Sequence, residues 1–220
     1  MIKNLFRKFT GYYPDKEISN WNLIFFCFSK FISLLRGFFC FFRMDCFKGK
    51  NSSIRCKNKV IFGKWLNIAE NVHMNALSYK GIEFGTSVSI GRNSRIECTG
   101  SFATLGVGFK CGDYCGLGTD CFYGAAGGIE IGNNVIIGNY VSMHSENHNF
   151  ERLDIPIRLQ GVNHKGIIIG NDCWIGAKVT VLDGAKIGSG TVIAAGSVVR
   201  GEFPDNVVIA GVPARIIKYR

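Results

Sequence analysis

Apolar side chains return every six residues through most of the chain, from residue 62 to residue 199. The pattern is clearest near the C-terminus, where Gly or Ala often occupies the next position. These apolar positions are Ile169, Ile175, Val181, Ile187, Ile193 and Val199, followed by Gly170, Gly176, Gly188 and Ala194. An amphipathic helix repeats about every 3.6 residues and a half-buried strand every two. A sustained period of six indicates a solenoid of short strands and corners.

The same period runs through four shorter blocks upstream. Their apolar positions are Phe62, Ile68 and Met74; Phe84, Ile90 and Ile96; Leu105, Cys111, Leu117 and Tyr123; and Ile131, Ile137 and Met143. Register shifts between the blocks correspond to inserted loops. The pattern predicts an all-β solenoid over residues 60–220, in which three six-residue units close one triangular coil. We expect one apolar side chain per unit to point inward and Gly to serve corners that need positive φ.

The longest interruption covers residues 144–166, with the sequence HSENHNFERLDIPIRLQGVNHKG. It is rich in polar residues and contains three of the four histidines, His144, His148 and His164. Long loops that leave a regular scaffold usually carry function or partner contacts. The spacing of His144 and His148 leaves three interpretations open, namely a metal site, a catalytic base or a solvated turn.

Residues 1–59 differ from the rest of the chain in both charge and pattern. Residues 1–60 contain twelve Lys and Arg against three Asp and Glu, which is +9 of the formal net charge of +10. Within them, residues 22–43 are almost entirely apolar, but Lys30 and Arg36 lie inside the run and make a membrane span expensive. Their polar residues form one stripe at helical spacing. We predict an amphipathic helix that either lies on an anionic membrane or packs against the repeat domain or a neighbouring subunit.

Composition narrows the function further. The repeat region is nearly neutral, so the basic charge does not belong to a nucleic-acid groove, and we expect no nucleic-acid partner. The nine Cys lack the paired spacing of a disulfide framework or a zinc site. No small-residue cleavage site follows the apolar run, so we expect no secretory signal. We expect a cytoplasmic protein with peripheral contact at the inner face of the cytoplasmic membrane through residues 22–43.

The C-terminal part carries a family resemblance. Residues 167–220, which include the phrases CWIG and AGVPARII, resemble the C-terminal half of hexapeptide-repeat O-acetyltransferases that act on maltose, galactosides and polysaccharide sugars. The phrase NHNFERLDIPIRLQG, residues 147–161, resembles their extended loop. The resemblance implies a left-handed parallel β-helix, a homotrimer with active sites between subunits, and acetyl-CoA as donor without a metal. Handedness follows from the resemblance alone, since crossover connections are normally right-handed.

Acetyl transfer from a thioester to a hydroxyl needs a base for the hydroxyl proton and donors for the oxyanion. Imidazole suits the first task because it titrates near neutral pH. By resemblance, His148 in the phrase HNF is the family's base, and His144 is a substrate contact or a polar residue at a strand end. Glu146 stands where relatives often have a second His. Whether it orients an imidazole, contacts the acceptor or faces water stays open.

The resemblance also implies donor-side residues. Trp174 would wall the acetyl and pantetheine end of the coenzyme, with Gly176 in the same phrase. The backbone N–H of Ala177 would bond the thioester oxygen, and the backbone of Ala195 would bond the pantetheine arm. In both roles the side chain matters little.

Four further residues follow from the same comparison. Arg215 of GVPAR would meet the phosphates of coenzyme A. Arg200 and Gly201 stand where relatives often carry Thr-Lys, so we interpret Arg200 as a replacement for the family lysine, one residue earlier. Asp120 and Tyr123 lie on coils that line the acceptor side in the family. They are candidate sugar contacts, with surface strand residues as the alternative.

Two other functions use the same solenoid. Gamma-class carbonic anhydrases bind a metal with three His across a subunit interface, but here the third ligand would have to be His73 or His164, neither in the expected phrase. We therefore expect an acetyl-CoA-dependent O-acetyltransferase acting on a sugar or a lipid-linked saccharide in capsule, O-antigen or exopolysaccharide assembly. An antibiotic acetyltransferase of the streptogramin or chloramphenicol type and a non-catalytic solenoid are the alternatives.

Overall fold

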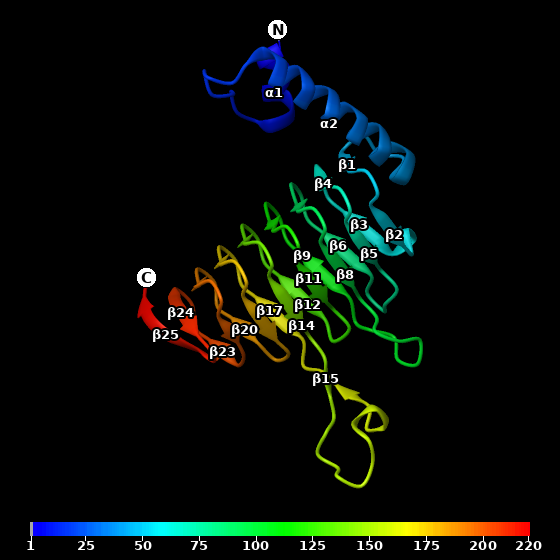
Figure 1. Ribbon diagram of the computed structural model, residues 1–220, viewed down its shortest axis with the longest axis vertical. Helices are drawn as coiled ribbons and strands as arrows, with labels where there is room; N and C mark the ends of the chain where they lie inside the picture. The colour runs from blue at the N-terminus through cyan, green and yellow to red at the C-terminus, as the bar shows by residue number, and fades with distance from the viewer. Residues whose placement is uncertain (1) are drawn as a thin grey trace.

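Three sheets wrap around one apolar interior in the computed structural model, which describes residues 2–220 except for the side chain of Phe9 (Figure 1). Successive strands along the chain belong to successive sheets, so each coil adds one strand to the first, second and third sheet in turn. Neighbouring coils pair in parallel. The left-handed parallel β-helix that the resemblance implies is confirmed.

The strands are short, as a six-residue unit requires. The first sheet contains β1 (Cys46–Lys48), β4 (Leu66–Ile68), β7 (Ser89–Ile90), β10 (Gly116–Leu117), β13 (Ile136–Ile137), β18 (Trp174–Ile175), β21 (Val192–Ile193), β24 (Val207–Gly211) and the antiparallel β25 (Ala214–Tyr219). The second contains β2 (Ser53–Arg55), β5 (His73–Asn75), β8 (Arg95–Glu97), β11 (Phe122–Gly124), β14 (Ser142–His144), β19 (Thr180–Leu182) and β22 (Val198–Val199). The third contains β3 (Val60–Phe62), β6 (Ile82–Phe84), β9 (Phe109–Cys111), β12 (Ile129–Ile131), β17 (Ile167–Ile169), β20 (Lys186–Ile187) and β23 (Glu202–Phe203).

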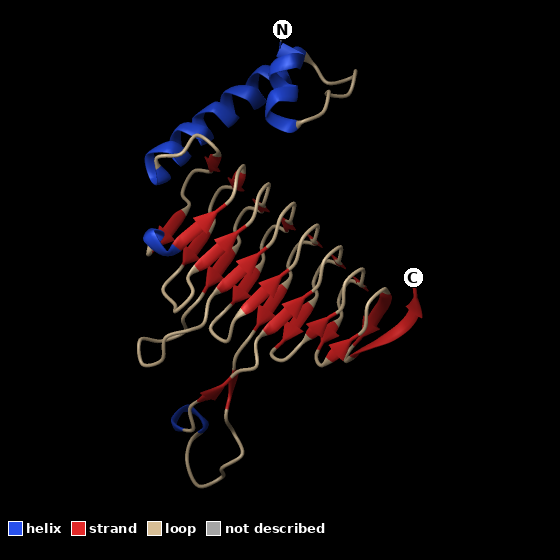
Figure 2. Ribbon diagram, turned by 180° about the vertical axis from the view of Figure 1, so that it is seen from behind, coloured by secondary structure: helices blue, strands red, loops and turns tan. Residues whose placement is uncertain are grey.

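The corners between strands stack into three edges. The first edge joins the first sheet to the second and includes residues 138–141, 176–179 and 194–197; the second edge joins the second sheet to the third and includes residues 98–108, 145–166 and 200–201; the third edge returns to the first sheet. Both long excursions leave the coil from the second edge (Figure 2).

The interior holds the apolar positions that the six-residue period predicts. All of them are buried except Leu105. In the second sheet, for example, Met143 pairs with Tyr123 on one side and Val181 on the other. Leu105 is half-buried in the excursion 98–108, outside the strands. The prediction there was wrong because the period was counted through an insertion.

We expected glycine at the corners because of positive φ, but Gly176 is required for another reason. Gly176 does not have positive φ, and the left-handed conformation falls two residues later, at Lys178 (φ 58°). A Cβ on Gly176 would lie 2.6 Å from the backbone nitrogen of Ala195 in the next coil. Here glycine is required by close backbone approach, whereas Gly196 (φ 73°) does serve a positive φ.

Two helices precede the coil, α1 (Ile2–Thr10) and α2 (Asn20–Phe41). The second agrees closely with the helix predicted over residues 22–43. Ser19 caps it, because its Oγ accepts a hydrogen bond from the backbone N–H of Asn22 at 3.3 Å. Among the described residues, α2 alone is long and apolar enough to cross a membrane by length and composition.

One face of α2 is packed. Leu23 and Cys27 bury themselves against Phe6 of α1. Farther along, Gly37 lies directly on the first coil, where a Cβ would come within 1.8 Å of the carbonyl oxygen of Cys46. This contact agrees with the prediction of packing on the repeat domain, for this face of the helix.

The coil begins before the residue at which the period becomes visible. Strands β1 and β2 pair with β4 and β5, so residues 46–59 form part of the first coil, although we placed the start of the repeat domain at residue 60. Lys48 occupies the register position of Ile68. Because a lysine occupies this inward position at the open end of the stack, the six-residue period of apolar residues is not visible there in the sequence.

Candidate active site

The loop 145–166 is anchored to the coil by one carboxylate. Oδ1 of Asp183 accepts hydrogen bonds from the backbone nitrogens of Lys165 and Gly166, both at 2.8 Å. Its Oδ2 accepts another from Nδ2 of Asn147 at 3.1 Å. Asp183 therefore joins the outgoing and returning strands of the loop to the next coil.

The rest of the loop is braced by its own side chains. Strands β15 (Asn147–His148) and β16 (Val162–Asn163) form a short antiparallel hairpin, followed outward by a 3-10 turn, η2 (Ile157–Leu159). Nδ2 of Asn149 donates to the carbonyl of Gln160 at 3.0 Å. The loop thus projects from the second edge as an ordered arm (Figure 1).

The two central histidines have different surroundings. His144 ends β14; its ring lies 5.6 Å from that of Phe122, and its Nε2 is hydrogen-bonded to the hydroxyl of Ser142. His148 lies in the hairpin, is exposed, and its imidazole has no hydrogen-bonding partner within residues 2–220. His148 is therefore free to meet a substrate, whereas His144 is already engaged.

Glu146 lies between the two histidines but is hydrogen-bonded to neither. Its carboxylate is half-buried and faces the excursion 98–108, where a Cβ on Gly100 would lie 3.8 Å from Oε1. Of the three predicted roles, orienting an imidazole has no support within the described chain. The position next to Gly100 brings the two excursions of the second edge together.

A groove of about 530 Å³ runs along the first edge and gathers four of the predicted donor-side residues. Trp174, Gly176, Ala177 and Ala195 all line it. Trp174 is 57% exposed, so its indole forms an apolar wall instead of a core contact. The four residues that the family resemblance assigned to the donor side therefore lie side by side in the structure.

Backbone donors along this groove lack the caps found on the third edge. There, each corner N–H donates to a polar side chain in the next coil; for example, the nitrogen of Asp113 donates to Oδ1 of Asn133 at 2.7 Å. On the first edge, alanine occupies the corresponding places at Ala177 and Ala195. Among the described residues, the N–H groups of Asn139, Ala177 and Ala195 have no hydrogen-bonding partner. The groove presents unsatisfied donors, which a ligand with acceptor oxygens would satisfy.

The two arginines lie in different places. Arg215 on β25 pairs with Ala210 of β24, next to Ile209, which pairs with Ile193 of the groove. Arg200 is exposed on the second edge, at the same edge as the loop and away from the groove. The structure thus places Arg215, but not Arg200, on the sheet that carries the groove.

The two candidate sugar contacts have structural roles. Asp120 occupies a left-handed corner (φ 55°), and its Oδ1 accepts a hydrogen bond from Nδ2 of Asn93 at 2.8 Å. Tyr123 is fully buried inside the coil, and burial raises its pKa well above the ordinary value. The assignment of Tyr123 as a sugar contact was wrong, since no acceptor reaches it. Within residues 2–220, no group of three or more His, Cys, Asp or Glu is placed to hold a metal ion.

Comparisons with known proteins agree with this fold. The family model "Bacterial transferase hexapeptide (six repeats)" matches residues 166–201. A Mycobacterium tuberculosis protein named "Probable acetyltransferase Rv3034c" is 33% identical over 82% of this chain and 56% of its own length. Galactoside O-acetyltransferase of Escherichia coli is 40% identical over 41% of this chain and 43% of its own. WbbJ of Escherichia coli, named for O-acetyl transfer in lipopolysaccharide biosynthesis, is 42% identical over 41% of this chain and 50% of its own.

Among solved structures, a mutant of AntD, an N-acyltransferase from Bacillus cereus in complex with dTDP and coenzyme A, superposes with a TM-score of 0.60. It is 23% identical and covers 73% of this chain and 84% of its own, a likeness of fold. The chain is thus similar to hexapeptide-repeat transferases, and relatives named as O-acetyltransferases are among its matches. It spans about half the length of the curated relatives it matches.

Sequence reasoning missed two features of the site. Asp183 follows a strand in an ordinary corner, and nothing in its neighbourhood reveals that it anchors a loop that leaves the coil one turn earlier. The free donors did have a signal. From Thr86 onward, the third-edge corners carry Thr, Asp, Asn or Ser in the second place, as at Asn171, whereas Ala177 and Ala195 occupy that place on the first edge.

We predict that Asp183→Ala loosens the loop without unfolding the coil, because it removes the acceptor for three donors at the loop base. Cleavage by trypsin after Arg152 or Arg158 should accelerate several-fold. Asp205→Ala is the matched control, since Asp205 accepts a similar backbone hydrogen bond from Ser189 on the third edge at 2.7 Å. Equal cleavage rates in both variants would contradict the anchoring role.

Proposed function

We propose that this protein is an acetyl-CoA-dependent O-acetyltransferase that acetylates a sugar hydroxyl. The observation that carries the proposal is the groove on the first edge, where Ala177 and Ala195 leave backbone N–H groups free beside Trp174. The thioester and the pantetheine amides of acetyl-CoA offer the matching acceptor oxygens. The relatives named as O-acetyltransferases support the same reaction class.

The reaction needs no covalent enzyme intermediate. His148 takes the hydroxyl proton while the hydroxyl oxygen attacks the thioester carbonyl carbon. The charge that develops on the carbonyl oxygen meets the free N–H of Ala177. The carbon–sulfur bond then breaks, the thiolate takes the proton back from the imidazolium, and an acetyl ester and coenzyme A leave. Arg215 supplies positive charge toward the phosphates, and Arg200 is a second candidate only from the second edge of a neighbouring chain.

The separation of His148 from the donor groove within one chain supports a homotrimer with sites shared between subunits. In one chain, His148 belongs to the second edge and the groove to the first, with the second sheet between them. A neighbouring chain that docks its loop beside the groove would bring base and donor together. Closed rotational symmetry would then give each subunit one complete site.

The exposed face of α2 supports contact with a membrane and therefore a lipid-linked saccharide as acceptor. Large apolar side chains recur there along the helix, namely Trp21, Ile24, Phe25, Phe28, Phe31, Leu35 and Phe39. The stripe is separate from Leu23, Cys27 and Gly37, through which the helix packs on α1 and the coil. We place the protein at the cytoplasmic face of the inner membrane, where a helix of this kind lies in the lipid interface.

We expect His148→Ala to lower turnover about a hundredfold or more while the trimer and the affinity for acetyl-CoA persist, because the base is lost and the groove is not. Coenzyme A release is measured with nucleotide sugars, lipid-linked sugars and antibiotics as acceptors. His144→Ala is the control and should retain most of the activity. A large loss in His144→Ala with full activity in His148→Ala would reverse the assignment, and no turnover of any acceptor by the wild type would favour a non-catalytic solenoid.

The free donors are tested by capping them. In Ala195→Asn, the new side chain stands where Asn133 stands on the third edge and accepts from the N–H of Ala177, so kcat/KM for acetyl-CoA should fall about tenfold or more. Ser189→Asn is the matched control, because Ser189 already accepts a corner N–H, that of Asn171, at 3.1 Å. If Ala195→Asn is as active as this control, the N–H of Ala177 has no part in the reaction.

A further inference from the structure

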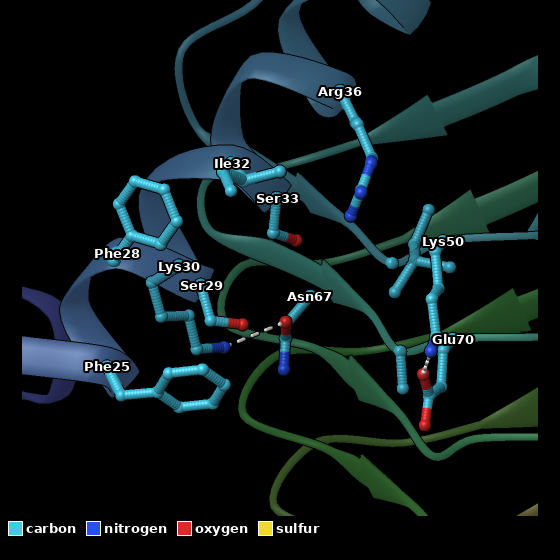
Figure 3. A pocket seen from close by; sticks show the side chains of 13 residues that line it. Phe25, Phe28, Ser29, Lys30, Ile32, Ser33, Arg36, Lys50, Asn67 and Glu70 are labelled. Atoms are coloured by element: carbon cyan, nitrogen blue, oxygen red, sulfur yellow. Dashed lines mark hydrogen bonds and ion pairs between the residues drawn. The ribbon is translucent and has the colours of Figure 1, made fainter. Parts of the chain in front are cut away.

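A cleft of about 560 Å³ separates α2 from the first coils (Figure 3). Its helix side carries Phe25, Phe28 and Ile32 beside Lys30 and Arg36. The coil side is polar and includes Lys50, Asn67 and Glu70. Neither the repeat fold nor the acetyl-transfer groove uses this cleft, which lies at the opposite end of the coil from β25.

The charges in the cleft are unbalanced. Three cations, Lys30, Arg36 and Lys50, face one carboxylate, that of Glu70. Lys50 lies 3.4 Å from Glu70 in a largely exposed ion pair, whereas Arg36 takes part in no ion pair or side-chain hydrogen bond within residues 2–220. A free guanidinium at the rim of a net positive cleft is a ready partner for an anion.

Lys30 is held in place at the bottom of the cleft. Its Nζ donates to Oδ1 of Asn67 at 3.1 Å and lies 5.1 Å from the centre of the Phe47 ring. Burial among these groups lowers its pKa. A nearby anion would favour its charged form.

The apolar wall continues onto the surface. Phe25 and Phe28 line the cleft and also belong to the exposed stripe of α2. A ligand that fills the cleft would therefore need an anionic group at its deep end and apolar chains toward the stripe. A second copy docked by the same face would bring the two sets of cations together, and the cleft supplies only Glu70 to offset them.

We propose that this cleft binds the phosphate headgroup of an anionic phospholipid, with Arg36 and Lys50 as its ligands and the acyl chains along Phe25 and Phe28. The proposal rests on the membrane contact of α2 proposed above and adds selectivity for headgroup charge. The phosphate fits the fork of Arg36, and Lys30 contributes charge from below. A site of this kind fixes the depth of the helix and therefore the height of the coil above the bilayer.

The test is flotation of the full-length protein with vesicles of phosphatidylcholine alone or mixed with phosphatidylglycerol. The wild type should bind the mixed vesicles, and the double variant Arg36→Gln/Lys50→Gln should bind them about tenfold or more weakly. The matched control is Arg92→Gln/Lys110→Gln, which removes the same charge elsewhere. Lys110 is paired with Glu83 at the same 3.4 Å that separates Lys50 from Glu70, and the side chain of Arg92, like that of Arg36, has no partner among the described residues.

The results of the flotation experiment distinguish the phosphate site from the membrane contact of α2 and from the acetyl transfer proposed above. Equal weakening of both double variants would overturn the site and leave general charge attraction. Equal binding to both kinds of vesicle, unchanged in the double variant, would also overturn it while the membrane contact stands. Absence of any vesicle binding, with trimers that associate unless Phe28→Glu is introduced, would assign the stripe to a second copy. Coenzyme A release with soluble acceptors reports the acetyl transfer independently.

Discussion

Hydrogen bonding between successive coils is the constraint on which the whole molecule depends. Each strand pairs with the strand one turn above and one turn below, so every coil must repeat the cross-section of its neighbour. Inward positions must then stay apolar, and corner residues such as Gly176 must leave room for the next backbone. Function has two places left within such a scaffold: loops that leave an edge, and corners where a capping side chain is missing. The proposed function uses both, at residues 145–166 and at Ala177 and Ala195.

These two places explain why the site is divided. A loop inserted at the second edge cannot reach the first edge of its own coil without crossing the second sheet. In the proposed function, the N–H groups of Ala177 and Ala195 and the imidazole of His148 therefore belong to different chains when they form one site. Assembly of chains is then a condition for catalysis in this account. The helix α2 is held on its packed face by α1 and the first coil.

Most of the fold could be predicted from the sequence because one inward residue per six determines a coil. The exceptions have physical causes. Leu105 continued the period by chance inside an excursion, and Lys48 broke it inside a true coil. We assigned Tyr123 two incompatible roles, inward residue and sugar contact. The structure buries its side chain completely, so only the inward role holds. The donor-side cluster was predictable by resemblance, and the absent caps of Ala177 and Ala195 had a sequence signal, because polar residues occupy the corresponding third-edge positions. The anchor Asp183 depends on a contact between coils that no local pattern encodes.

The claim that the site is shared between subunits is tested most directly by mixing two inactive chains. His148→Ala lacks the base, and Ala195→Trp fills the groove, so trimers of either variant alone should be inactive. Mixed trimers, co-expressed with different tags and purified through both, contain interfaces that combine an intact loop with an intact groove. The account predicts recovery of about a third of wild-type turnover, because one of the three interfaces in every mixed trimer combines an intact loop with an intact groove. Mixed trimers that stay as inactive as their parents would contradict it.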